Sequence, residues 1–168
     1  MGRIASDIMQ KQQEHLQLLY MVNDMLRQAD ADGLNISVIL PRILRVAAVE
    51  LNASSGSIII ADTESGVEYS WNVDGDDSYQ TNYLPFIDKV MEHGIAGQAV
   101  RSHQTICIQN TLTDSRWWQR PDHRTAQEPW SAICTPLIAR QRSIGAITIT
   151  KQGIGQFDHN DVNLLEAL

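Results

Sequence analysis

The residues of this chain that are best suited to chemistry gather in one polar segment, residues 113–130. It holds three of the four tryptophans and several basic side chains: Trp117, Trp118, Trp130, Arg116, Arg120, His123 and Arg124. An indole ring supplies a flat apolar wall, and arginine and histidine supply donors for an anionic or carbonyl group. Because long connections in compact domains tend to be functional, the pattern predicts a lid over a small-molecule pocket. The candidate ligand-binding residues are Trp117, Trp118, Arg120, His123 and Trp130, with Trp71 as a neighbour. An equally weighted interpretation is that the tryptophans anchor the segment while the basic groups face water.

The two cysteines, Cys107 and Cys134, are the candidate nucleophiles. Both lie in apolar stretches, Ile-Cys-Ile and Ile-Cys-Thr-Pro, and cysteines in such surroundings are usually inert core residues. The sequence has no Gly-x-Ser-x-Gly elbow, no zinc spacing of the His-Glu-x-x-His or Cys-x-x-Cys kind, and no phosphate-binding Gly-x-x-x-x-Gly-Lys loop. The acidic residues at 74–83 lack the spacing of a calcium loop. We therefore expect no catalytic residue and no metal site, which favours a protein that is not an enzyme.

The composition excludes several other classes. The chain has 168 residues, enough for about one domain, with a net charge of −7 and 13 scattered lysines and arginines that argue against a nucleic-acid surface. No apolar run approaches the roughly 20 residues of a membrane span, and the N-terminus lacks the pattern of a signal peptide. Two cysteines do not make a disulfide framework, so a reducing, cytoplasmic setting is the default expectation.

The first 32 residues are expected to form an amphipathic linker or dimerisation helix, with helical spacing over residues 4–29. Apolar side chains follow two seams rather than one, and a single domain face needs only one. We expect one seam to pack on the domain and the other on a partner helix; the alternative is a wholly buried helix. The candidate dimerisation residues are Ile8, Leu18, Val22 and Met25.

Beyond residue 33, the chain alternates short helical and strand patterns. Helices are expected at 35–51, 85–92 and 97–102, and strands at 57–60, 67–73, 105–109, 131–138 and 144–150. Polar loops are expected at 74–83 and 110–129. A last helix, capped by Asp158 or Asn160, runs to Leu168 without a stop signal, so we expect a fragment of a longer protein. Strands that come in hairpins predict a mainly antiparallel sheet with helices on its faces, an α+β fold.

Several motifs, in this order and spacing, resemble those of a GAF domain over residues 33–168. The hairpin Ser131-Ala-Ile-Cys-Thr-Pro136-Leu137 with Ile144-Gly145-Ala-Ile-Thr-Ile149 is similar to the family's "S-l-vPl…iGvl-l" pattern. The closing stretch Phe157-x-x-x-Asp161-x-x-Leu164-Leu165 is similar to its "F-…-D…l" helix. Two further segments complete the resemblance: Gly94-Ile-Ala-Gly97-Gln-Ala-Val100 followed by Ile106-Cys-Ile108, and Asp114-Ser-Arg-Trp117.

The resemblance implies a central antiparallel sheet of five or six strands. The N- and C-terminal helices would cover one face, and short helices with a long loop would cover a pocket on the other. Members of the family are usually regulatory parts of multi-domain signalling proteins such as sensor histidine kinases or cyclases. The implied function is non-catalytic sensing of a small molecule, coupled through the terminal helices of a homodimer to an effector. The alternatives are a ligand-free dimerisation or spacer domain and, third, a free methionine sulfoxide reductase.

Signatures of individual GAF subfamilies narrow the choice of ligand or cofactor. The cyclic-nucleotide signature Asn-Lys…Phe…Asp-Glu is matched at Lys151, Phe157 and Asp161, but Thr150 and Val162 replace its Asn and Glu, so this ligand has weak support. Residues 114–130 contain no cysteine, which argues against covalent bilin. His123 is the candidate haem ligand, and haem is not favoured. The reductase branch uses loop cysteines, whereas both cysteines here fall in expected strands.

Overall fold

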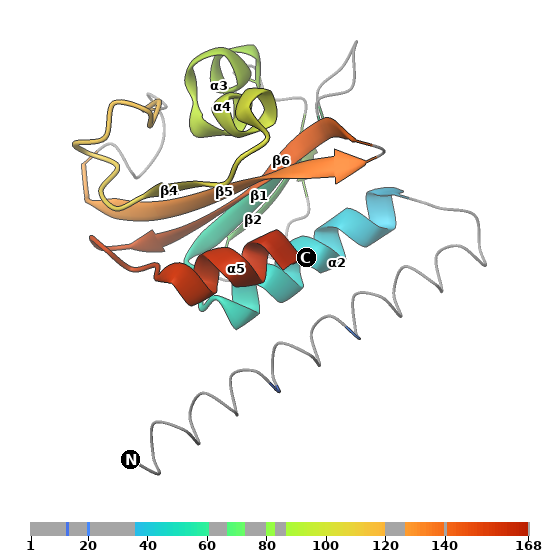
Figure 1. Ribbon diagram of the computed structural model, residues 1–168, viewed down its shortest axis with the longest axis horizontal. Coiled ribbons are helices and arrows are strands. Elements are labelled where there is room, and N and C mark those ends of the chain that lie inside the picture. The colour runs from blue at the N-terminus through green and yellow to red at the C-terminus, as the bar shows by residue number, and fades with distance from the viewer. Residues whose placement is uncertain are drawn as a thin grey trace.

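The computed structural model describes residues 36–60, 67–72, 80–82, 87–119, 127–139 and 141–167, together with residues 13 and 20. Its centre is a six-stranded sheet in the order β3-β2-β1-β6-β5-β4, with every neighbouring pair antiparallel (Figure 1). The strands are β1 Ser55–Ile60, β2 Val67–Asn72, β3 Gln80–Asn82, β4 Ile106–Ile108, β5 Trp130–Ala139 and β6 Arg142–Gln152. The antiparallel sheet of five or six strands that the sequence predicts is therefore confirmed.

Helices cover both faces of this sheet. Helices α2 (Ile36–Glu50) and α5 (His159–Ala167) lie side by side on one face, and α3 (Ile87–His93) and α4 (Ile95–Ser102) lie on the other (Figure 1). We call these the α2/α5 face and the α3/α4 face. This division of the helices between two faces agrees with the α+β architecture implied by the sequence.

Strand alternation divides the core into two apolar layers. Ile58 of β1 and Ile147 and Ile149 of β6 pack under α2 and α5, together with Leu44 and Leu165. The neighbouring positions of the same strands point to the other face, because successive side chains of a strand alternate. They form a second layer with α3 and α4: Ile59, Ala146, Ile106, Ile108, Ala132, Cys134, Ile87, Ile95, Ala96 and Ala99.

Two glycines mark points of close backbone approach. A Cβ atom on Gly97 of α4 would lie 1.6 Å from the carbonyl oxygen of Met91 in α3, so the crossing of these helices requires glycine. A Cβ atom on Gly145 of β6 would lie 2.1 Å from the carbonyl oxygen of Ile59 in β1. Both residues belong to motifs that carry the family resemblance, and their role is steric.

Two details of the sequence prediction are corrected. The short strand β3 lies within residues 74–83, which the sequence assigns to a loop. Gln80–Asn82 is entirely polar, and this edge strand pairs with only one neighbour, β2, so no apolar alternation marks it. Helix α4 is also longer than the expected turn at 97–102, since it begins at Ile95.

Of the expected helix at 4–29 the structure describes only residues 13 and 20, and the dimerisation candidates Ile8, Leu18, Val22 and Met25 lie outside the described residues. Among the helices that are described, none is long and apolar enough to span a bilayer.

Candidate functional site

Small hydroxyl side chains lie along the middle of the α3/α4 face, on β1 and β6. The register pairs Ser57 with Thr148 and Ser55 with Thr150, and alternation sets all four on the same face as Ile59 and Ala146. We call Ser55, Ser57, Thr148 and Thr150 the hydroxyl row. The Ser55 and Thr150 hydroxyl oxygens are 2.6 Å apart, and Thr150 Oγ1 also lies 3.3 Å from the Ser55 carbonyl oxygen.

The sequence analysis missed the hydroxyl row. The available signal was the alternation of Ser or Thr with Gly or Ile in residues 55–58 and 147–150, which has the period of a strand. Thr148 also reaches its neighbour on β5, because its hydroxyl donates to the Sγ atom of Cys134 at 3.2 Å. The row therefore borders the apolar layer formed by β4, β5 and α4.

Residues 109–119 continue from β4 on the α3/α4 side of the sheet (Figure 1). The Thr111 N–H donates to the Trp130 carbonyl at 2.8 Å, and the Trp130 N–H donates to Thr111 Oγ1 at 3.2 Å. The Gln119 amide then donates to the Thr111 carbonyl at 3.3 Å. These bonds extend the β4–β5 ladder and fix the start of the loop against the start of β5.

Trp117 and Trp130 share the α3/α4 face. Trp117 packs against the apolar layer of β4, β5 and α4, and alternation sets Trp130 on the same face as Ala132 and Cys134. Both indole Nε1 atoms are buried, and neither has a hydrogen-bond partner within the described part of the chain. A buried donor without an acceptor costs about 1–3 kcal/mol, so two of them in one region require an explanation.

Arg116 is held by its own loop. Its guanidinium donates to both carboxylate oxygens of Asp114, at 2.9 and 2.6 Å, and to the Cys107 carbonyl at 3.2 Å. These hydrogen bonds from Arg116 keep the pKa of the Asp114 carboxyl below its usual value, against a smaller opposing effect of burial. The Asp114 side chain also accepts the Arg116 backbone N–H at 3.0 Å. Arg116 therefore stabilises its own loop, where its charge is paired with Asp114.

A polar network on the opposite face begins at Ser131, the residue after Trp130. The Ser131 hydroxyl oxygen lies 3.0 Å from the Gln109 carbonyl and 2.8 Å from the Gly153 carbonyl, and it accepts the Gln156 N–H at 3.1 Å. The Gly155 N–H donates to the same Gln109 carbonyl at 3.0 Å. Ser131, fully buried, therefore joins the end of β4 to the segment that leads into α5.

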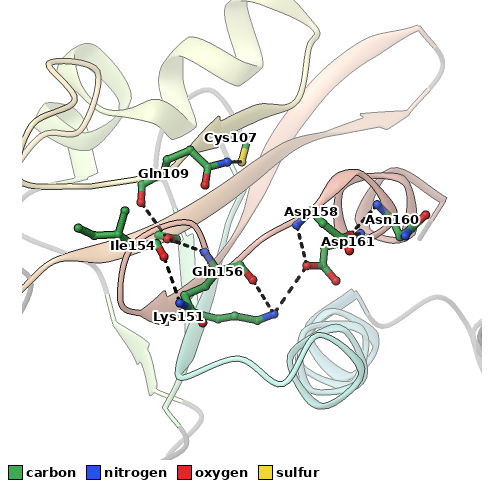
Figure 2. A network of polar contacts seen from close by, with 9 residues as sticks. Cys107, Gln109, Lys151, Ile154, Gln156, Asp158, Asn160 and Asp161 are labelled. Atoms are coloured by element: carbon green, nitrogen blue, oxygen red, sulfur yellow. Dashed lines mark hydrogen bonds and ion pairs between the residues drawn. The ribbon is translucent and has the colours of Figure 1, made fainter.

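Lys151 continues this network to α5 (Figure 2). Its ammonium donates to the Gln156 carbonyl at 3.3 Å, lies 3.8 Å from Asp161 Oδ2 and lies 4.5 Å from the centre of the Phe157 ring. Asp161 Oδ2 also accepts the Asp158 N–H at 3.0 Å. Lysine, aromatic ring and carboxylate together fix the first turn of α5 against β6.

A sequence model of the GAF domain matches residues 33–168. The chain belongs to the GAF domain family. Among curated proteins, it is 21% identical over 171 residues to a probable 3',5'-cyclic phosphodiesterase of Caenorhabditis elegans, a match that covers 98% of this chain and 24% of that protein. The chain thus spans about a quarter of the length of this relative.

Solved structures show the same fold at low identity. The GAF domain of A. aeolicus nlh2 in an inactive state is 15% identical, with a TM-score of 0.62 over 94% of this chain and 90% of that chain. The free methionine-R-sulfoxide reductase of Neisseria meningitidis, in complex with its substrate, is 19% identical, with a TM-score of 0.58 over 91% and 82%. GAF domains are thus a generally regulatory fold that also includes enzymes.

The structure of this GAF domain brings together some of the tryptophans singled out in the sequence. Trp117 and Trp130 share a face, and Trp118 is half-buried in the same loop. The backbone of Trp71 pairs with Gly56 of β1, and its side chain lies outside what the structure describes. Arg120 and His123 lie outside the described residues.

The two cysteines of this GAF domain lie on opposite faces of the sheet. Cys134 is fully buried on the α3/α4 face, and burial raises the pKa of its thiol to about 12. Cys107 is half-buried against the α2/α5 layer, where burial is the largest influence and raises the pKa of its thiol. A thiol is nucleophilic only when ionised, so neither cysteine is activated. The expectation of a core cysteine is confirmed for Cys134 and holds only in part for Cys107.

Lys151, Phe157 and Asp161, the three positions that match the cyclic-nucleotide signature, meet on the α2/α5 face. They lie across the sheet from Trp117 and Trp130. In this chain their contacts hold β6 to α5.

Proposed function

We propose that this GAF domain is a regulatory module that binds a small molecule on its α3/α4 face. The resulting conformational change is transmitted to a downstream effector through the terminal helices. The observation that carries the proposal is the position of Trp130 and Ser131. These consecutive residues of β5 belong to opposite faces, one to the tryptophan-bearing face and the other to the network that holds α5.

A ligand that displaces the Trp130 backbone also acts on the main chain of the next residue, Ser131. The hydrogen bonds of Ser131 then reach the Gly153 carbonyl and the Gln156 N–H, and Lys151 connects Gln156 to Asp161 in α5. A ligand shifts such an equilibrium only by the difference in its affinity for the two states. The network supports a route by which that difference changes the packing of α5 on β6.

The finer parts of the proposal concern the parent protein. The two apolar seams of residues 4–29 support a homodimer through the terminal helices, with Ile8, Leu18, Val22 and Met25 at the interface. We place the domain in a cytoplasmic signalling protein such as a sensor histidine kinase or a cyclase. Light scattering at high micromolar concentration tests the dimer, and a monomer under those conditions contradicts it.

Binding and coupling can be tested separately. Purified protein is screened against nucleotides and metabolites by tryptophan quenching and by thermal shift. A compound counts as a hit when it gives at least one of these two signals. Hydrogen exchange of residues 157–167 is then measured with and without the hit. We expect the ligand to change exchange in α5, and the absence of any hit across the panel contradicts the proposal.

Ser131→Ala tests the route. It removes the hydroxyl that lies between the Gln109 and Gly153 carbonyls, so we expect ligand binding to persist while the response of α5 is lost. Ser143→Ala is the matched control, because its buried hydroxyl has no hydrogen-bond partner among the described residues. If α5 responds equally in both variants, the signal does not pass through Ser131.

A further inference from the structure

The unpartnered indole donors identify the chemistry of the ligand. We infer that the α3/α4 face binds an uncharged, planar small molecule that presents hydrogen-bond acceptors, carbonyl oxygens or ring nitrogens, to the indole N–H groups of Trp117 and Trp130. This inference rests on the proposed function, because it names the ligand class for the same face. The two Nε1 atoms are buried and have no acceptor among the residues that the structure describes.

Three of the four hydroxyls of the hydroxyl row already have partners. The Thr148 hydroxyl donates to Cys134 Sγ, and the hydroxyls of Ser55 and Thr150 bond each other and the Ser55 carbonyl. Each hydroxyl carries only one hydrogen, so these contacts use the donors of Thr148, Ser55 and Thr150 within the protein. The two indole N–H groups, in contrast, are buried donors without an acceptor among the described residues, and an acceptor is the group that completes them.

The charge within residues 109–119 favours a neutral ligand. Arg116 is the only cationic residue within 109–119, and its guanidinium is paired with Asp114 and the Cys107 carbonyl. An indole N–H carries no net charge, and burial of an anion without a paired cation is strongly unfavourable. A neutral acceptor on a planar ring avoids this penalty.

The surroundings of the donors favour a flat molecule. Trp117 packs on an apolar layer that includes Ile106, Ile108 and Ala132. Aromatic rings stack on one another with an energy beyond that of area burial alone. A planar heterocycle can therefore contact an indole ring or the aliphatic layer while its edge atoms accept the N–H hydrogen bonds.

Three small probes of similar size distinguish the ligand classes. Pyrazine offers two ring-nitrogen acceptors and no donor, benzene offers neither, and pyrazine-2-carboxylate adds a negative charge. The readout is the set of four indole N–H signals of ¹⁵N-labelled protein, assigned with single Trp→Phe variants, together with the amide signals of residues 106–108 and 132–134.

We expect pyrazine to shift the Trp117 or Trp130 indole signal downfield, benzene to leave both indole signals in place, and the carboxylate to bind more weakly than pyrazine. Trp117→Phe and Trp130→Phe keep apolar bulk but remove the donor. The variant that lacks the tryptophan whose signal pyrazine shifts should therefore bind pyrazine with a Kd about fivefold higher. Unchanged affinity in that variant overturns the inference.

Other outcomes distinguish a failure of this inference from a failure of the proposed function. If the carboxylate binds best, or if the probes shift the amides of β4 and β5 without either indole signal, the ligand class is wrong while ligand binding at this face stands. If cross-peaks to water show both indole hydrogens already bonded in the probe-free protein, the donors are water-satisfied and the inference falls. If no probe and no metabolite perturbs this face, the proposed function fails as well.

Discussion

The ammonium of Lys151 lies 4.5 Å from the centre of the Phe157 ring and 3.8 Å from Asp161 Oδ2. One cation thus contacts a core aromatic ring and a helix carboxylate at the same time. Both charged side chains are mostly buried, with 16% and 23% of their surface exposed. Partial burial weakens solvent screening, so this contact contributes more than an ordinary surface ion pair.

Replacing Lys151 should loosen α5. Lys151→Met keeps the aliphatic chain and removes the charge, and we expect the free energy of unfolding to fall by about 1–2 kcal/mol. Lys89→Met, on the exposed side of α3, is the control and should change stability by less than about 0.5 kcal/mol. Urea denaturation checks both variants. Equal losses would mean that the Lys151 contact adds nothing.

The N-terminus of α5 depends on Asp158. Its Oδ1 atom accepts the Asn160 and Asp161 N–H groups at 2.8 and 3.0 Å, which confirms one of the two predicted caps. Asp158→Ala should lower stability by about 1 kcal/mol, and Asp158→Asn, which keeps a capping oxygen, should lose much less. Thermal unfolding compares the two variants. A loss in the Asn variant as large as in the Ala variant would contradict a capping role.

Gly97 should not tolerate a side chain. Because an added Cβ would meet the Met91 carbonyl oxygen at 1.6 Å, Gly97→Ala must separate α3 from α4, and we expect a loss of about 3 kcal/mol or more. Gln98→Ala changes the exposed neighbour in the same helix and should be nearly neutral. Denaturant midpoints distinguish them, and similar midpoints would show that the helices adjust freely.

The loop after β4 should respond to acid. The bonds from Arg116 lower the pKa of Asp114 in the folded state, so their stabilisation is present above the ordinary aspartate pKa of about 3.9 and is lost as pH falls through the lower folded value. The backbone signals of residues 114–117 should therefore stay constant from pH 7 to about pH 4 and change below it. Asp114→Asn should abolish that transition. A transition that survives in this variant would have another origin.

The cysteines should label in a fixed order. Raised pKa values keep both thiols protonated at neutral pH, and Cys134 is also fully buried, so a thiol reagent at pH 8 should modify Cys107 slowly and Cys134 only after unfolding. Cys107→Ser leaves one thiol and should show no labelling in the native state. Rapid labelling of that variant would contradict the burial of Cys134.

Sequence patterns anticipated the fold where side-chain periodicity reflects burial. Two examples are the hairpin of β5 and β6, whose strands carry largely continuous apolar runs separated by a polar turn, and the helix α2, whose apolar residues follow the period of a helix. Strand β3 escaped prediction because its pairing depends on main-chain groups and not on side-chain pattern.

The candidate site on the α3/α4 face was harder to anticipate, because it depends on which residues are neighbours in space. Composition indicated the segment that carries Trp117 and Trp130, but the use of Arg116 within its own loop depends on the position of Asp114 and of the Cys107 carbonyl in space. The hydroxyl row depends on which strands are neighbours, because Ser57 and Thr148 are distant in sequence and adjacent in the sheet. An unpartnered donor such as the Trp130 indole is visible only once all of its neighbours are placed.

The adjacency of Trp130 and Ser131 also limits how the sequence can change. Residues added before Pro129 only lengthen a connection, and the Pro129 carbonyl still meets the Gly153 N–H at 2.8 Å. A single residue inserted between Trp130 and Ser131 would move the tryptophan one step along the strand and reverse the face on which it lies. Length variation among homologues should therefore stop abruptly at Pro129, and the spacing from Trp130 to Pro136 should be invariant wherever this mode of signalling is kept.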